Sequence, residues 1–376
     1  MTGADDAPRR RPRRRRWGLV LAVLLLLLAA AEIALRVHER GLAGEAFVSE
    51  EMAEYLAAEP YLAVHDDEMP YRNAPGLDTV AGGVRYRHDE RGWRVTADEV
   101  TAGSPGSPGS SGAPVTVAFL GDSMTYGWGV PAEDALPELA AAALGGRIKA
   151  LNLGVSAFGT TPEVRLYERD RQALSDQEVE VVVLIVFPND FAAGPFAWHA
   201  GTGFLAVDAL PLPAGLRNRL SSLALYRGLA SWHSGVARRE GRWDGTAPES
   251  ADTVLAPLTR LIEDVVGDGR RLLIAYLPAV ADLVGDTHAW QPAVLAAVCA
   301  ERDVPFVDLR AGYLRAWESA KAARPALVAT RSEQDALRAW SLRHWVLSLQ
   351  DQHLNATGNR GVADELAPAV AALLDR

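Results

Sequence analysis

The sequence predicts an α/β protein, a three-layer α/β/α sandwich with a mostly parallel five-stranded sheet. From residue 115 onward, apolar runs of strand length alternate with amphipathic stretches of helix length, which is typical of parallel strands joined by right-handed crossovers. The runs are continuous in Val, Ile and Leu, as expected for strands covered on both faces. A chain of 376 residues, 49% of them hydrophobic and 23% charged, has room for one such domain and an extension.

Each element of the sandwich corresponds to a run in the sequence. The predicted strands are Val115–Leu120, Lys149–Leu153, Val179–Phe187, Arg271–Leu277 and Val304–Leu309. The predicted helices are Glu133–Leu144, Pro162–Leu174, Ala251–Val266, Gln291–Arg302 and a last one after Asn355, where Val362, Leu366, Val370, Leu373 and Leu374 recur at helical spacing.

Two segments fall outside this alternation. Residues 38–114 form a mixed extension that ends in Ser104–Pro114, a linker rich in Gly, Ser and Pro. Residues 191–250 are expected to be a part-helical insertion in the domain of residues 115–376. This insertion either forms a wall or lid at the ligand edge of the sheet or only packs on the domain.

The N-terminus carries the pattern of a membrane signal anchor. Seven arginines crowd residues 1–16, and the apolar stretch Trp17–Leu35 follows at once, interrupted only by Glu32. At about 1.5 Å per residue this stretch spans roughly 28 Å, close to the thickness of a bilayer core. Positive charge stays in the cytoplasm, so residues 1–16 are expected inside, residues 17–37 in a bacterial cytoplasmic membrane and the remainder outside. A signal peptide cleaved near Ala29-Ala30-Ala31 is the alternative, and it exports the same domain.

The charge balance argues against a nucleic acid partner. The formal net charge is −10, although the first 16 residues contribute seven arginines against Asp5 and Asp6. Without those nine residues the chain has 31 basic and 46 acidic side chains, a formal charge of −15. The remainder of the chain therefore lacks the basic surface that nucleic acid binding needs to neutralise phosphates.

A serine stands where the first predicted strand ends. Gly121-Asp122-Ser123 follows Leu120 directly and precedes a helix. Ser123 is therefore expected at the exposed edge of the sheet, where its own N–H can help to bind an oxyanion. The tripeptide alone is equally compatible with a serine that satisfies a turn.

Three further segments follow in order along the chain: Asn152-Leu153-Gly154, Phe187-Pro188-Asn189-Asp190 and Asp351-Gln352-His353. Together with Gly121-Asp122-Ser123 they resemble the four sequence blocks of the SGNH (GDSL-type) serine hydrolases, a family named after its Ser, Gly, Asn and His. The matching residues are Ser123, Gly154, Asn189 and His353.

The resemblance covers residues 115–376, with two small departures. Met124 stands where the first block has a leucine, and one residue separates Asp351 from His353, where many members have two. The upstream segment Glu90-Arg91-Gly92-Trp93-Arg94 is similar to a Gly-aromatic-Arg element that precedes the first block in anchored members.

The resemblance implies a flavodoxin-like SGNH fold and acyl-transfer chemistry. Ser123 would attack an ester carbonyl, His353 would take its proton and pass it to the leaving alcohol, and Asp351 would orient the imidazole. The Ser123 N–H, the Gly154 N–H and the Asn189 amide would bind the oxyanion. Supporting roles are expected for Asp122 and Asp190, as turn and cap residues, and for Asn152, which would hold a loop.

His344 is the other late candidate for the general base. It has no acid within two residues, whereas His353 follows Asp351 closely and precedes the last helix. The sequence therefore favours His353.

No metal or cofactor is expected. The histidines form no HExxH spacing, Gly127-Trp128-Gly129 lacks the third glycine of a dinucleotide loop, and no Walker lysine motif occurs. The single cysteine, Cys299, excludes an internal disulfide and any multi-cysteine zinc site, and is expected to be apolar filler on a helix.

Three functions remain open. The first is hydrolysis of O-acyl esters, such as acetyl groups on envelope or extracellular glycans. The second is transfer of an acyl group onto such a glycan through the same acyl-serine intermediate, and the third is a non-catalytic envelope protein that binds glycan. The expected partners are an ester or acylated glycan and the cytoplasmic membrane, and the sequence identifies no protein partner.

Overall fold

The computed structural model describes residues 14–45, 63–64, 72–81, 83–96, 113–156, 158–191, 196–199, 203–206, 251–284, 288–329, 332–347 and 353–375. Its centre is a five-stranded sheet in the order β11-β10-β7-β5-β6, in which every neighbouring pair is parallel. The strands are β5 (Val115–Leu120), β6 (Ile148–Asn152), β7 (Val179–Val186), β10 (Arg271–Tyr276) and β11 (Phe306–Asp308). The predicted α/β class and the five predicted strands are confirmed, with small shifts at the strand ends.

Helices cover both faces of the sheet, which makes the three layers. Side chains of β7 alternate between the two cores: Val182, Leu184 and Val186 face one core, whereas Val181, Val183 and Ile185 face the other. The first core is closed by α6 (Thr160–Asp176), α9 (Ala251–Gly267) and α10 (Trp290–Glu301). The second is closed by α5 (Leu136–Ala143), α11 (Arg310–Ala323) and α13 (Ala356–Leu374).

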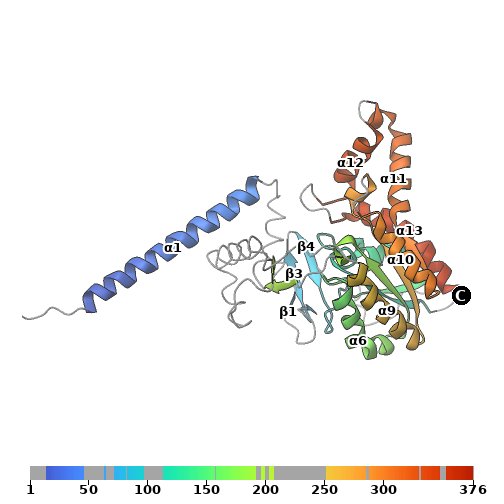
Figure 1. Ribbon diagram of the computed structural model, residues 1–376, viewed down its shortest axis with the longest axis horizontal. Coiled ribbons are helices and arrows are strands. Elements are labelled where there is room, and N and C mark those ends of the chain that lie inside the picture. The colour runs from blue at the N-terminus through green and yellow to red at the C-terminus, as the bar shows by residue number, and fades with distance from the viewer. Residues whose placement is uncertain are drawn as a thin grey trace, which may run out of the picture.

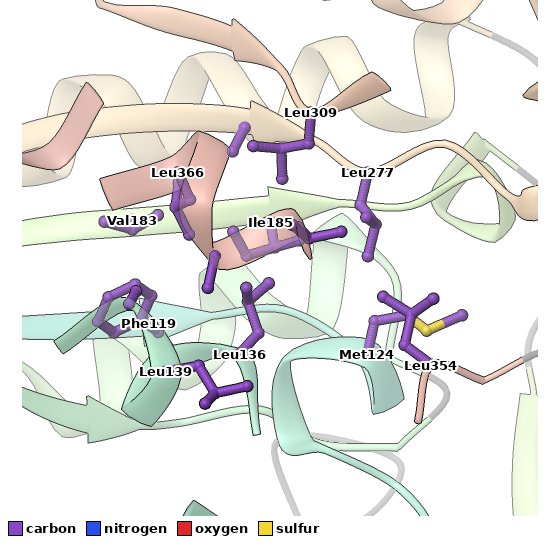
Figure 2. Close-up of a cluster of buried hydrophobic side chains, with 14 of the residues drawn as sticks. Phe119, Met124, Leu136, Leu139, Val183, Ile185, Leu277, Leu309, Leu354 and Leu366 are labelled. Carbon is purple, nitrogen blue, oxygen red and sulfur yellow. The ribbon is translucent and has the colours of Figure 1, made fainter. Parts of the chain in front are cut away.

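The second core reaches the edge of the sheet where the strands end. Figure 2 shows Met124 and Leu354 in the same cluster as Leu136, Ile185 and Leu277. Met124 follows Ser123 in the short helix α4 (Ser123–Tyr126), and Leu354 follows His353. Burial of these two neighbours anchors both backbones in one apolar cluster, because each side chain would lose that burial if its backbone moved.

A helical excursion lies between β11 and His353. It contains α11, the short η5 (Pro325–Val328) and α12 (Glu333–His344), and Figure 1 shows α11 and α12 extending beyond the sheet. Aromatic rings hold it together, since Trp340 contacts Trp317 and Trp345 at centroid distances of 5.7 and 4.6 Å. Neither helix is among those that the sequence predicted.

Part of the extension packs on the domain. Strands β3 (Asp78–Ala81) and β4 (Val84–Arg87) form an antiparallel hairpin, and β1 (Ala63–Val64) pairs with β2 (Arg72–Asn73). Trp93, four percent exposed, joins the core beneath α6, and its indole N–H donates to Asp170 at 2.7 Å.

The N-terminal helix α1 (Arg14–Glu45) is longer than the apolar stretch from which a membrane anchor was predicted. Figure 1 shows it apart from the sheet, and large apolar side chains from Val20 to Leu28 are exposed. Within the described residues, no helix combines the length and apolarity that a membrane span requires. The anchor therefore stays a prediction.

Of the insertion predicted at residues 191–250, the structure describes Phe191 and a hairpin of β8 (Phe196–His199) and β9 (Gly203–Ala206). The rest of the insertion lies outside the described residues, as does most of the linker at 104–114.

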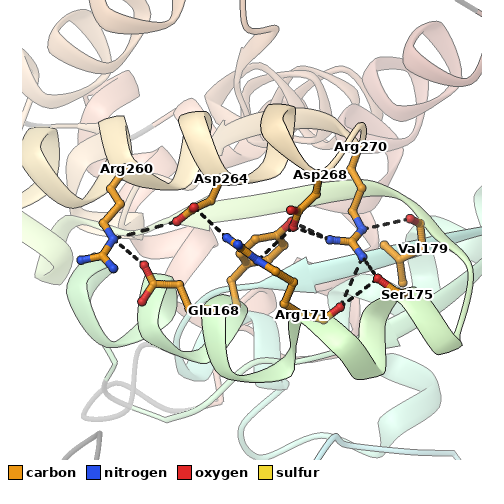
Figure 3. Close-up of polar contacts among 9 residues, drawn as sticks. Glu168, Arg171, Ser175, Val179, Arg260, Asp264, Asp268 and Arg270 are labelled. Carbon is orange, nitrogen blue, oxygen red and sulfur yellow. Dashed lines mark hydrogen bonds and ion pairs between the residues drawn. The ribbon is translucent and has the colours of Figure 1, made fainter.

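A polar network joins α6 to α9 on the outer side of the first core (Figure 3). Arg171 forms ion pairs with Asp264 and Asp268 at 2.7 and 3.1 Å, and the buried Arg270 contacts Asp268 at 2.8 Å. Arg270 also donates to the Val179 carbonyl oxygen at 3.2 Å. The network therefore fixes α6 and α9 against the start of β7.

Candidate active site

Ser123 lies at the carboxyl end of β5, in the first turn of α4. Asp122 is the N-cap, and its Oδ1 accepts the Met124 N–H at 2.8 Å. Gly121 has φ of +153°, and a Cβ there would lie 2.1 Å from Thr125 Oγ1, so only glycine permits this tight approach of strand and helix. The turn sets the backbone of Ser123, a residue that is 7% exposed.

His353 faces this serine. Its Nε2 lies 2.7 Å from Ser123 Oγ. The backbone of His353 is held by the Leu347 N–H, which donates to its carbonyl oxygen at 2.9 Å, and by Asn355, which caps α13 by accepting from Thr357 and Gly358. The Trp128 ring lies against the imidazole at a centroid distance of 5.8 Å. A serine hydroxyl and an imidazole in this contact can exchange a proton directly.

Asn189 reaches the same place from the neighbouring strand. It lies in η3 (Pro188–Phe191) after β7, is exposed, and donates from Nδ2 to Asp122 Oδ2 at 3.0 Å. Strands β5 and β7 are the adjacent pair at which the sheet order changes direction, the usual ligand edge of such sheets. Burial raises the pKa of Asp122, and the bonds from Met124 and Asn189 oppose that rise.

Gly154 lies close against the Ser123 helix. A Cβ at Gly154 would lie 2.2 Å from the Tyr126 backbone nitrogen, so no larger residue fits. Its N–H donates to Asn152 Oδ1 at 3.0 Å, and Asn152 Nδ2 donates to the Thr125 and Tyr126 carbonyl oxygens at 3.1 and 3.3 Å. Asn152 therefore joins the Gly154 segment to the end of α4. The Gly154 N–H already has an acceptor in this structure, and its role toward an oxyanion stays a prediction.

Arg94, two percent exposed, braces the loop after α4. It donates to the carbonyl oxygens of Tyr126, at 2.6 Å, of Gly127, and of Val130, at 2.5 Å. Its guanidinium lies 4.8 Å from the ring centroids of both Tyr86 and Tyr126. The sequence indicated the Gly-aromatic-Arg segment, but the contact partners of Arg94 could not be read from it.

His88 is a second buried group behind this loop. Its Nδ1 lies 2.8 Å from the Ala74 carbonyl oxygen, which can only accept, so Nδ1 carries the hydrogen of the neutral ring. Nε2 therefore accepts from the Tyr126 hydroxyl at 2.9 Å. Burial lowers the pKa of His88 to about 4, so the ring is neutral at physiological pH.

Two buried acids adjoin the segments of the candidate site. Asp190 was expected to be a turn or cap residue; it is 2% exposed, and its Oδ2 accepts the Phe187 N–H at 3.3 Å. Glu163 on α6 was not singled out, although it is fully buried. The buried residues Glu163, Leu166, Tyr167, Asp170 and Leu174 recur at helical spacing, and this stripe could have indicated a buried acid.

The remaining candidate residues fall elsewhere. Asp351 lies outside the described residues, so the structure says nothing of its contact with His353. His344 ends α12, and its ring contacts Trp340 at a centroid distance of 5.0 Å.

Cys299 is buried on α10, as predicted. The described residues include no group of three or more metal-binding side chains that could hold an ion.

No protein-family model and no curated protein matches the chain. Solved structures that align with it include a carbohydrate acetylesterase family member from Sinorhizobium meliloti, at 15% identity and a TM-score of 0.38, over 70% of this chain and 100% of that one. The acetyl xylan esterase AlAXEase aligns at 18% identity and a TM-score of 0.37, over 68% and 100% of the two chains. The esterase EstA from Pseudoalteromonas sp. aligns at 13% identity and a TM-score of 0.36, over 69% and 99%.

Proposed function

We propose that this protein is a serine esterase of the SGNH type, which hydrolyses O-acyl esters with Ser123 as nucleophile and His353 as general base. One observation carries the proposal: the 2.7 Å contact between His353 Nε2 and Ser123 Oγ at the carboxyl edge of a parallel sheet, beside Asn189. A serine hydroxyl is a weak nucleophile until a base accepts its proton. The four sequence blocks and this geometry support the same assignment.

In the proposed reaction, Ser123 Oγ forms a bond to the ester carbonyl carbon while its proton moves to His353 Nε2. Collapse of the tetrahedral intermediate breaks the bond to the leaving alcohol, whose oxygen takes the proton from His353. Water then gives a proton to His353 and attacks the acyl-serine, and the proton returns to Ser123 as the acid departs. Asp351 would orient the imidazole and stabilise its charge.

The oxyanion would be bound at the start of α4. Ser123 is the first residue of that helix, so its N–H has no acceptor within the helix. The Asn189 Nδ2 atom carries two hydrogens, one of which serves Asp122, and the Asn189 side chain is exposed to an incoming substrate. The Gly154 N–H would have to leave or share Asn152 Oδ1 to join them.

The proposed substrates are acylated glycans outside the cytoplasmic membrane. The motivation is the arginine block followed by an apolar stretch, which predicts an anchored, exported domain. A reporter that works only outside the cytoplasm, fused after residue 376, should be active. Activity of a strictly cytoplasmic reporter at that position would refute export.

Transfer to a sugar hydroxyl is the second candidate, because it uses the same acyl-serine. The experiment is to incubate the full chain in detergent with p-nitrophenyl acetate and with acetylated glycans, with and without an acceptor sugar. Free acetate that requires Ser123 supports hydrolysis, and acetylated acceptor supports transfer. A Ser123→Ala protein as active as the parent would refute both, and glycan binding without any turnover would favour the non-catalytic alternative.

A further inference from the structure

Three carboxyl groups gather behind the nucleophile, and two of them are short of hydrogen-bond partners. Asp122, Glu163 and Asp190 are all at most 2% exposed. Neither Glu163 oxygen, nor Oδ1 of Asp190, has a hydrogen-bond partner among the described residues. They come from three elements: the turn after β5, the first turns of α6, and η3 after β7.

The two aspartates are tied to the reacting groups. Asp122 precedes Ser123, caps its helix and accepts the Asn189 amide. Asp190 follows Asn189 and accepts the Phe187 N–H in the same turn. Gly159, the N-cap of α6, lies against the same turn, because a Cβ on it would lie 3.7 Å from the Asp190 Cα. The first turn of α6, which carries Glu163, therefore lies beside the turn that holds Asn189 and Asp190.

Three buried carboxylates cannot all be ionised, because each charge is costly to bury and repels the others. Asp122 has the partners that favour the ionised form: the Met124 N–H, the Asn189 amide and the nearby His353. Burial, and then the charge of Asp122, hold the pKa of Glu163 well above its usual range. Burial, with Glu163 and Asp122, does the same for Asp190.

We propose that Glu163 is a positioning residue, which acts as a neutral carboxylic acid to support the two aspartates that hold Ser123 and Asn189. The expected effect of Glu163 on turnover rests on the proposed function, whereas its neutral protonation state does not. A neutral acid fills the space between the turns without adding a second negative charge beside Asp122. An ionised Glu163 would repel both aspartates and loosen the turns that they fix.

Other charged groups near α6 are already paired. On α9, which packs along α6, Arg260 pairs with Glu168, and Asp264 pairs with Arg171. These residues belong to the network of Figure 3, beyond the first turns of α6 where Glu163 lies. The groups that act on the Glu163 charge are thus Asp122 and Asp190, with His353 acting through Asp122.

The test compares Glu163→Gln, a neutral mimic of the same shape, with the parent. The pKa of Glu163 is higher in the folded protein than in the unfolded chain, where it is near 4.5. Above pH 4.5, folding therefore requires the uptake of a proton by Glu163, and the folded state loses stability as the pH rises. Glutamine avoids this cost. We expect the Tm of Glu163→Gln, relative to the parent, to rise as the pH increases above about 4.5, by at most roughly 3 °C per pH unit. The exposed control Glu301→Gln should show a constant difference.

Ester turnover supplies the second measurement, on the full chain in detergent. Glu163→Gln should keep kcat within about threefold of the parent, whereas Glu163→Ala should lower kcat about tenfold or more with little change in KM. A pH-independent Tm difference, or equal loss of turnover in both variants, would overturn the proposal. If the parent shows no esterase activity, the proposed function fails. The pH dependence of the Tm difference still tests whether Glu163 is a neutral acid, so the two failures can be told apart.

Discussion

His353 Nε2 lies 2.7 Å from Ser123 Oγ, although the two residues are 230 positions apart in the chain. The contact depends on two neighbours that share one apolar cluster, Met124 after the serine and Leu354 before the last helix. A base and a hydroxyl held from opposite ends of a domain in this way are positioned by the core, not by local sequence.

Asn189→Ala is expected to lower kcat by about 10² to 10³ with little change in KM, because its amide acts mainly on charge that develops in the transition state. The side chain is exposed, so the fold should survive its removal. Steady-state kinetics on an ester substrate, with circular dichroism for folding, provide the check. An unchanged kcat would remove Asn189 from the site.

Gly154→Ala is expected to destabilise the protein by about 1–3 kcal/mol and to reduce turnover, because the new Cβ would lie 2.2 Å from the Tyr126 nitrogen. Gly361→Ala is the matched control. Its Cβ meets nothing within 4 Å on helix α13, so it should stabilise by about 0.5–1 kcal/mol. Denaturant unfolding of both variants measures the difference, and equal effects would contradict the close packing at Gly154.

Arg94→Lys is expected to cost about 2–3 kcal/mol of stability, because one ammonium cannot serve the three carbonyl oxygens that the guanidinium reaches. Arg91→Lys is the control, since Arg91 is partly exposed and should change stability by less than about 0.5 kcal/mol. If Arg94→Lys is as stable and active as Arg91→Lys, the loop after α4 does not depend on this brace.

Acid should destabilise the fold through His88. Its pKa falls from 6.5 to about 4 on folding, so the unfolded chain binds more protons in that window. Stability is full above pH 6.5 and declines as pH falls toward 4, by up to about 3 kcal/mol. His88→Gln should remove this component, which unfolding of parent and variant at pH 7, 6 and 5 would show. Parallel stability curves for the two proteins would contradict a buried neutral ring.

The sheet was predictable because its strands are buried on both faces. A continuous apolar run such as Val181–Val186 would be costly to expose to water, and the stripe from Val362 to Leu373 requires a helix face against a core. Helices α11 and α12 were missed because each buries only two large or apolar side chains in the core, Tyr313 and Trp317 on α11 and Ala336 and Leu337 on α12, which is too few for a regular stripe. The two helices pack through tertiary contacts such as that between Trp317 and Trp340, which the local sequence does not indicate.

The residues of the candidate site that belong to sequence motifs could be predicted from the sequence. Ser123, Asn189 and His353 follow recognisable sequence blocks, and the structure brings these three to one edge of the sheet. The groups behind them were not predictable in the same way. Arg94 and His88 contact residues more than 30 positions away, and such contacts depend on tertiary packing that no local pattern records.

The most direct test of the account is fluorophosphonate labelling of the full chain, followed by peptide mapping. We expect the probe on Ser123, and we expect His353→Ala to slow labelling at least about 100-fold while remaining folded. His344→Ala, which removes a ring that contacts Trp340 instead, should label at nearly the parent rate. A folded His353→Ala protein that labels as fast as the parent, or a label on another serine, would contradict the proposed Ser123–His353 pair.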